Sequence, residues 1–179
     1  DSSTSRGRGD VYKRQVVDKR GSSLGDLPNT ISIMSRRSTD NGKNWSEPVV
    51  VAQGGNGKTY GDPAVVLDKK TGNLICMFVG DQGLWNATPY NRQGIYVSKS
   101  TDNGVSWSEP VAITDQVYAN HSGWYAGFAG SGHGLCLKDG RLMFVLAIRA
   151  TSATGVPLHN YAIYSDDGGC LLYTSPKPT

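Results

Sequence analysis

The sequence has few cysteines, no long apolar run and no large excess of one charge, and each shortage excludes a class of protein. Its three cysteines, Cys76, Cys136 and Cys170, form no CxxC spacing, which argues against a zinc site or a disulfide framework. No apolar stretch approaches the length of a membrane-spanning helix, and no segment shows a convincing 3.6-residue periodicity. Helices should therefore be few, and neither a metal nor another cofactor is expected.

The formal net charge of +3 comes from the two ends of the chain. Without residues 1–15 and 170–179, the numbers of acidic and basic side chains are equal. The strings GDVYKRQ, from Gly9, and CLLYTSP, from Cys170, resemble translated sequencing adaptors. We therefore expect residues 1–15 and 170–179 to be non-native tails and residues 16–169 to form one partial domain. A basic arm for nucleic acid is the less favoured alternative, and no nucleic-acid partner is expected.

The sequence does contain an internal repeat. The segment STDNGKNWSEP at 38–48 recurs as STDNGVSWSEP at 100–110, and SDDGG at 165–169 begins a third copy. Asn-Gly supplies the positive φ of a tight turn, Ser and Asp side chains can accept hydrogen bonds from turn amides, and Trp can cover the turn. The copies are therefore predicted to stabilise the fold without a catalytic role.

Strand-like runs surround each copy of the repeat. They are predicted at 31–36, 94–99 and 160–164 before the copies, at 49–52 and 111–114 after them, and as hairpins joining 64–67 to 74–79 and 133–137 to 141–148. About four strands per unit of roughly 60 residues is typical of a propeller blade. The chain is therefore predicted to be all-β, with parts of three blades.

The repeated Ser-x-Asp-x-Gly-x-x-Trp pattern is the Asp box, and with its surroundings the chain resembles the bacterial sialidase family from about Val17 to Gly169. Besides the boxes, the resemblance depends on DKR at 18–20, GD at 25–26, NTISIMSRRS at 29–38, GDPAVV at 61–66, FAGSGHGL at 128–135 and KDGRL at 138–142. It implies a six-bladed β-propeller, of which about two and a half blades are present. Substrate would lie at the mouth of the central channel, with the Asp boxes on the opposite rim.

The resemblance also implies an exo-α-sialidase, a retaining glycoside hydrolase that removes terminal sialic acids from glycoconjugates. Asp26 matches the general acid/base, Arg20 matches an arginine near the sugar's carboxylate and 4-hydroxyl, and Asp62 matches a residue on the 4-hydroxyl side. Guanidinium groups bind carboxylates in two-point geometry, and a loop carboxyl can protonate a leaving oxygen. From local sequence alone, Asp26 could be a turn residue, Arg20 a solvated strand end and Asp62 a cap at a strand start.

Other parts of the family's site are not found in this chain. The family uses a tyrosine nucleophile paired with a glutamate, and neither is present here in its family context. Most of the arginine triad that binds the substrate carboxylate is also missing, so we expect the chain as it stands to be inactive. A trans-sialidase is a close variant, and a non-catalytic Asp-box propeller that binds carbohydrate or protein is the alternative from a different class.

The resemblance implies sialylated glycans as partners and a secreted, periplasmic or cell-surface location for the complete protein, while the oligomeric state is left open. The aromatic residues Trp85, Trp124, Tyr125 and Phe128 fall in segments between the predicted strands, where packing is their ordinary role. Exposed aromatics there could instead stack on sugar faces or line an N-acetyl pocket. His133, in the glycine-rich stretch 130–134, could border the substrate pocket.

Overall fold

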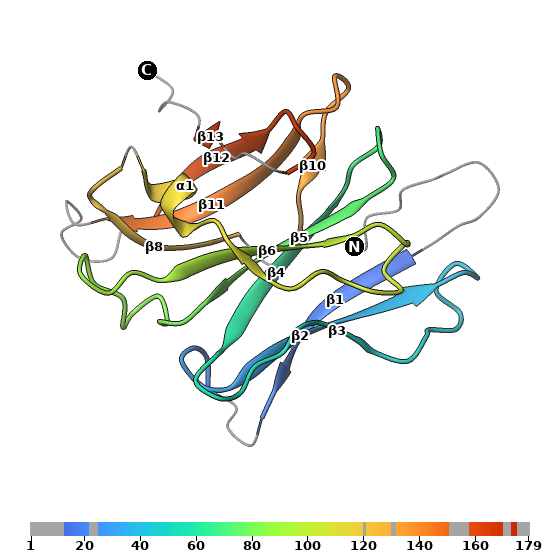
Figure 1. Cartoon of the computed structure of the whole chain (residues 1–179), viewed down its shortest axis with the longest axis horizontal. Coiled ribbons are helices and arrows are strands. Elements are labelled where there is room, and N and C mark those ends of the chain that lie inside the picture. Colours follow the sequence, from blue (N-terminus) through green and yellow to red (C-terminus); the bar gives the residue numbers. More distant parts are fainter. Residues whose placement is uncertain are drawn as a thin grey trace.

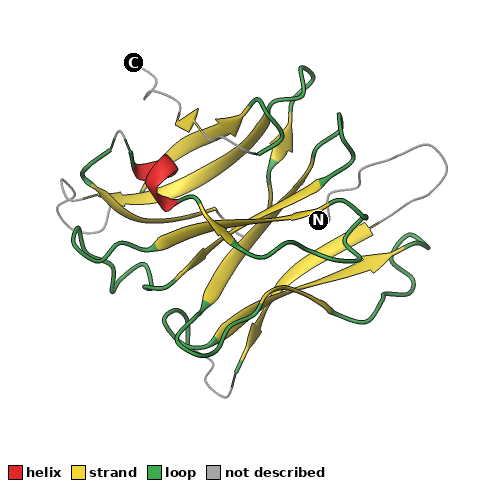
Figure 2. Ribbon diagram, viewed as in Figure 1, coloured by secondary structure: helices red, strands yellow, loops and turns green. Residues whose placement is uncertain are grey.

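The computed structural model describes residues 13–21, 25–119, 121–129, 132–150, 158–169 and 173–174. These residues form three β-sheets, with the second sheet in the middle (Figure 1, Figure 2). Within the described ranges the only helix is α1, Thr114–Tyr118. The predicted all-β class with few helices is confirmed, and the number of blades stays a prediction.

The first sheet contains β1 (Lys13–Arg20), β2 (Ile31–Ser38) and β3 (Val49–Ala52), and its pairs are antiparallel. Strand β1 pairs with β2 along its whole length, from Lys13 opposite Ser38 to Arg20 opposite Ile31. This register places Arg20 and the first Asp box at opposite ends of the sheet.

The second sheet is the middle one, and its strand order is β7-β6-β5-β4-β9. Its members are β4 (Tyr60–Leu67), β5 (Leu74–Gly80), β6 (Gly94–Ser100), β7 (Val111–Ala112) and β9 (Gly132–His133). Strand β9 runs parallel to β4, so a short piece from the third repeat unit joins this sheet. The strand predicted at 111–114 is shorter in the structure, where β7 ends at Ala112 and α1 begins at Thr114.

The third sheet consists of β8 (Trp124–Ala129), β10 (Leu135–Cys136), β11 (Leu142–Ala150), β12 (His159–Ser165) and β13 (Tyr173–Thr174). Both β8 and β10 pair with β11. The sequence interpretation treated 124–129 as an inter-strand segment, and this was wrong. It also predicted a continuous strand over 133–137, whereas the structure divides this stretch between β9 and β10, which belong to different sheets.

The assignment of the two ends to non-native tails stays a prediction. Residues 13–15 belong to β1 and pair with β2, and residues 173–174 pair with β12. The rest of both segments, 1–12 and 170–172 together with 175–179, lies outside the described residues.

The core is built on both faces of β5, which is buried at all seven of its positions. Because side chains alternate along a strand, Ile75 and Met77 face one neighbouring sheet and Cys76 and Phe78 the other. The first pair packs in a cluster with buried residues of β11, and the second pair with Ile33 and other residues of the first sheet. A fully buried side chain of this size stabilises the fold by about 1.5–3 kcal/mol. Because β5 contributes such side chains to both clusters, it connects the cores on the two sides of the middle sheet.

The three repeat copies adopt the same turn, as predicted. In each, the serine hydroxyl donates to the aspartate two residues on, at 2.7, 2.8 and 2.7 Å, and accepts from the glycine amide four residues on, at 2.8 Å. Asn103 and Gly104 have φ values of 60° and 81°, the left-handed geometry that Asn-Gly favours. The Ser106 hydroxyl and amide are the main donors that lower the pKa of Asp102 to about 2.

Candidate functional site

Three predicted site residues converge at the ends of strands, on the side opposite the Asp boxes. Arg20 is the last residue of β1, Asp26 follows in the loop toward β2, and Asp62 lies near the start of β4. The Nη2 atom of Arg20 lies 3.6 Å from Oδ1 of Asp26. Asp62 is close enough to both residues for their charges to change its pKa. The structure thus brings together residues from two sheets that are up to 42 positions apart in the sequence.

The loop that carries Asp26 is held from both sides. Leu27 is buried against Ile31 and Val79, and a cis peptide bond joins it to Pro28. The carbonyl of Asp26 accepts hydrogen bonds from the Asn29 backbone amide at 3.1 Å and from its side-chain amide at 2.6 Å. These contacts hold the backbone at 26–29 while leaving the Asp26 side chain 68% exposed. Asp26 is therefore a positioned carboxyl that faces solvent.

The guanidinium of Arg20 lies between strand and loop. Its Nη1 atom donates to the carbonyl oxygen of Gly25 at 2.9 Å, and Nη2 lies 3.6 Å from Oδ2 of Asp18. Its side chain is 33% exposed. Arg20 is thus oriented by the same loop that presents Asp26.

Asp62 has an unusual backbone. Its φ is +51°, and the β4–β5 register shifts between Gly61 and Ala64, which marks a bulge. Bulges re-aim side chains and are frequent next to active sites. Burial, followed by the negative charges of Asp26 and Asp18, raises the pKa of Asp62 to about 6, while Arg20 opposes the shift. Asp62 can therefore exchange a proton in the mildly acidic range.

A fourth residue, Asp18, belongs to the cluster, and the sequence interpretation gave it no role. Its side chain is 20% exposed, and burial raises its pKa, with Arg20 opposing that shift and Asp26 adding to it. The signal that could have identified it is spacing. Asp18 and Arg20 are two residues apart on one strand, so their side chains share a face.

The aromatic residues that could either pack in the fold or contact a sugar differ in how exposed they are. Trp124 and Tyr125 are 5% and 9% exposed, as expected for packing, whereas Trp85 is 61% exposed. The Arg149 guanidinium lies 5.5 Å from the Trp85 ring centroid and 5.2 Å from that of Tyr125. A side chain at Gly83 would meet the Leu27 carbonyl oxygen at 2.2 Å, so the loop carrying Trp85 contacts the Asp26 loop. The exposed ring of Trp85 itself packs against Arg149 of β11, in the third sheet.

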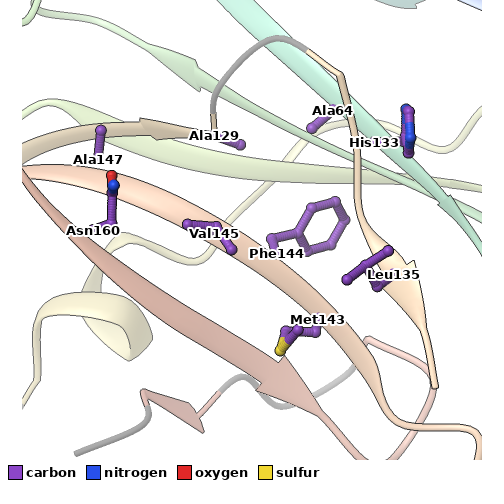
Figure 3. A pocket seen from close by; sticks show the side chains of 9 residues that line it. All are labelled: Ala64, Ala129, His133, Leu135, Met143, Phe144, Val145, Ala147 and Asn160. Atoms are coloured by element: carbon purple, nitrogen blue, oxygen red, sulfur yellow. The ribbon is translucent and has the colours of Figure 1, made fainter. Parts of the chain in front are cut away.

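A pocket of about 330 Å³ lies elsewhere, and its walls are mostly apolar (Figure 3). Ala64, His133, Leu135, Phe144 and Val145 are among its lining residues, and none of the four clustered charged residues lines it. His133 thus lines this pocket, and its predicted place at the border of the substrate pocket stays a prediction. Over the described ranges, no group of three or more His, Cys, Asp or Glu residues is arranged to hold a metal ion. In the same ranges, no helix is long and apolar enough to cross a membrane.

Comparison with known proteins gives the same family by sequence and by structure. The family described as "BNR repeat-like domain" matches residues 11–175. A sialidase of Bacteroides fragilis is 32% identical over 173 residues, which cover 86% of this chain and 30% of that protein. The structure of Hadza microbial sialidase Hz136 matches with a TM-score of 0.78 and 26% identity, covering 91% of this chain and 34% of that one.

A more distant structure supports the fold alone. The Trypanosoma rangeli sialidase, solved in complex with sialic acid, matches with a TM-score of 0.72 at 17% identity, over 92% of this chain and 28% of that one. The chain thus spans about a third of the length of each of these relatives.

Proposed function

This chain belongs to the sialidase family, through its BNR repeat-like domain, and we propose that the complete protein is an exo-α-sialidase that hydrolyses terminal sialic acids with retention of configuration. The three sheets would form part of a six-bladed propeller. They contribute the acid/base side of its site, and the 179-residue chain is inactive by itself. The complete protein acts outside the cytoplasm, where sialylated glycans are found.

Asp26 is the general acid and base in this proposal. Its carboxyl protonates the glycosidic oxygen as the bond to the anomeric carbon breaks, and it later recovers a proton from the attacking water. The covalent partner of the anomeric carbon is a tyrosine oxygen outside this chain, with a glutamate taking up the phenol proton. The exposed Asp26 side chain, on the backbone held at 26–29, suits a group that must reach both the leaving oxygen and water.

Arg20 and Asp62 bind the sugar. The Arg20 guanidinium donates hydrogen bonds to carboxylate and hydroxyl oxygens of the substrate, and Asp62 accepts or donates one at the 4-hydroxyl side. Within the described part of the chain the cluster holds three carboxylates and one guanidinium, so the further arginines that bind the substrate's carboxylate together with Arg20 are expected to come from the remaining blades.

One observation carries the proposal. Arg20, Asp26 and Asp62 come from two sheets and meet at the strand ends opposite the Asp boxes, with an Arg20–Asp26 separation of 3.6 Å. A non-catalytic Asp-box propeller does not require charged residues to meet in this way, because its boxes alone stabilise the turns.

The test is Asp26→Asn in the complete protein, with the exposed Asp115→Asn as a matched control. Loss of a general acid slows hydrolysis by about 10²–10⁴-fold when the leaving group is a sugar. The loss should be much smaller for a nitrophenyl sialoside, because nitrophenolate leaves without protonation. Initial rates on both substrates measure the difference, and Asp115→Asn should match the wild type on both.

Two outcomes decide against the proposal. If Asp26→Asn keeps wild-type rates on sialyllactose, Asp26 is an ordinary turn residue. If the wild-type complete protein binds sialosides but does not cleave them, the protein is the non-catalytic Asp-box module instead. Transfer of sialic acid to added lactose, in place of release to water, would identify a trans-sialidase.

A further inference from the structure

Asp18 occupies the boundary between the first and second sheets. It lies on β1, and Val16, two residues before it, packs against a core cluster that includes Tyr60 and Phe78 of the second sheet. Because alternate residues share a strand face, Val16, Asp18 and Arg20 all point toward that neighbouring sheet. The intervening residue Val17, by contrast, is 39% exposed. Asp18 is therefore a charged residue at the inter-sheet contact, beside the candidate site.

Asp18 lies beside two groups of the site. Its Oδ2 atom lies 3.6 Å from the Arg20 guanidinium, and its carboxylate is close enough to Asp62 for its charge to raise the pKa of that residue. Asp62 lies in the bulge of β4, where a positive φ on a residue other than glycine must be stabilised by its surroundings. One carboxylate thus lies beside both the side chain of Arg20 on β1 and the bulge that directs Asp62 on β4.

We propose that Asp18 is a positioning residue, which holds the Arg20 guanidinium and the bulge at Asp62 in one arrangement across the boundary between the two sheets. The inference rests on the proposed sialidase function, because it concerns groups assigned to sugar binding. It assigns no contact with substrate to Asp18 itself. Asp18 acts by keeping two binding groups from different sheets at a fixed separation.

The charge on Asp18 separates this role from simple packing. The charged groups that face it are Arg20 on its own strand, Asp26 on the loop and Asp62 on β4. Its negative charge raises the pKa of Asp62 and competes with Asp26 for the Arg20 guanidinium. Removing the charge without changing the side chain's size should therefore shift Arg20 toward Asp26 and lower the pKa of Asp62.

The experiment uses Asp18→Asn and Asp18→Ala in the complete protein with a fluorogenic α-sialoside. Asparagine keeps the size and polarity of the side chain but loses the charge that pairs with Arg20, whereas alanine loses both. KM should rise roughly tenfold in Asp18→Asn and further in Asp18→Ala. The value of kcat should fall less, because Asp26 is unchanged. In Asp18→Asn, the midpoint of the pH–rate profile that reports Asp62 should move to lower pH.

The matched control is Asp68→Asn, which follows β4 at the end of that strand away from Asp62. Asp68 is 2% exposed and accepts hydrogen bonds from the Lys70 amide at 2.9 Å and the Thr71 hydroxyl at 2.6 Å. Its substitution should lower the melting temperature and leave KM and the pH profile as in the wild type. The control thus measures what loss of a buried carboxylate does to folding alone.

The proposal is overturned if both Asp18 variants keep the wild-type KM and pH midpoint, or if they lose activity only in proportion to melting temperature. A wild-type protein without hydrolytic activity would instead refute the proposed function. The titration of Asp62, followed by carboxyl ¹³C NMR, then decides the role of Asp18. A lower midpoint in Asp18→Asn supports it, and an unchanged midpoint overturns it.

Discussion

Asp62 joins a left-handed backbone conformation to a carboxyl whose charged form is disfavoured. Its φ of +51° and its raised pKa of about 6 both place a cost on the folded protein at neutral pH. A carboxyl of normal pKa would impose only the first of these. Costs of this kind concentrate at functional sites, where the surrounding structure holds a residue in a conformation that it would not otherwise adopt.

The raised pKa predicts how stability depends on pH. The folded pKa of about 6 exceeds the ordinary value of 3.8, so the favourable contribution of Asp62 is present below about pH 4 and is lost as pH rises through 6. Asp62→Asn should therefore stabilise the complete protein at pH 7 by about 1 kcal/mol, after allowance for partial exposure, and should not stabilise it at pH 4. Thermal unfolding at the two pH values measures this, and equal shifts at both would contradict it.

Residue roles were predictable from the sequence only in part. The family resemblance identified Arg20, Asp26 and Asp62 as candidates, but spacing could not, because Asp62 approaches Asp26 only through packing of β4 against the first sheet. Asp18 was within reach of elementary reasoning, since it lies two residues from Arg20 on one strand. The raised pKa of Asp62 was not, because it depends on burial and on neighbours from other elements.

Among the elements, the Asp-box turns were the most predictable, because every interaction in them is local. Strand β3 was predicted with its observed bounds, 49–52, and β5 within one residue. Strand β8 was missed because its partner β11 lies further along the chain, and a strand of this kind is defined by pairing more than by its own residues. The tryptophan of the second box also has a longer-range role, since Trp107 Nε1 donates to the Ser35 hydroxyl of the first sheet at 2.9 Å.

The box turns should contribute to stability and not to catalysis. Ser100 is 1% exposed and its hydroxyl bonds both Asp102 and the Gly104 amide. Ser100→Ala leaves that buried amide without its acceptor, which should lower the free energy of unfolding by about 1–3 kcal/mol. The neighbouring exposed residue Thr101, changed to alanine, is the control. Chemical denaturation of the complete protein measures both, and a change in KM for sialosides in Ser100→Ala would contradict the assignment.

At the scale of the whole molecule, the three sheets bury their apolar residues unequally. Alternate residues of β11, such as Leu142 and Leu146, are buried against the middle sheet, whereas Val145 on the opposite face is 49% exposed. Leu135 on the adjoining strand β10 is 50% exposed, and both side chains line the apolar pocket (Figure 3). In a closed propeller a sheet face of this kind packs against the next blade. In the 179-residue chain by itself the face is open to solvent.

The isolated chain should therefore self-associate through this face, because exposed contiguous apolar surface favours contact with another copy. Replacing Val145 and Leu135 together by lysine should reduce association, since two like charges oppose burial of the face. Val105→Lys is the matched control, because Val105 is 45% exposed but lies in a box turn. Sedimentation velocity over a range of concentrations measures the mass of each variant. A wild-type chain that stays monomeric and melts sharply at a concentration-independent temperature would show that three sheets suffice for a stable unit. The next blade would then be needed only to complete the site, and not to cover the core.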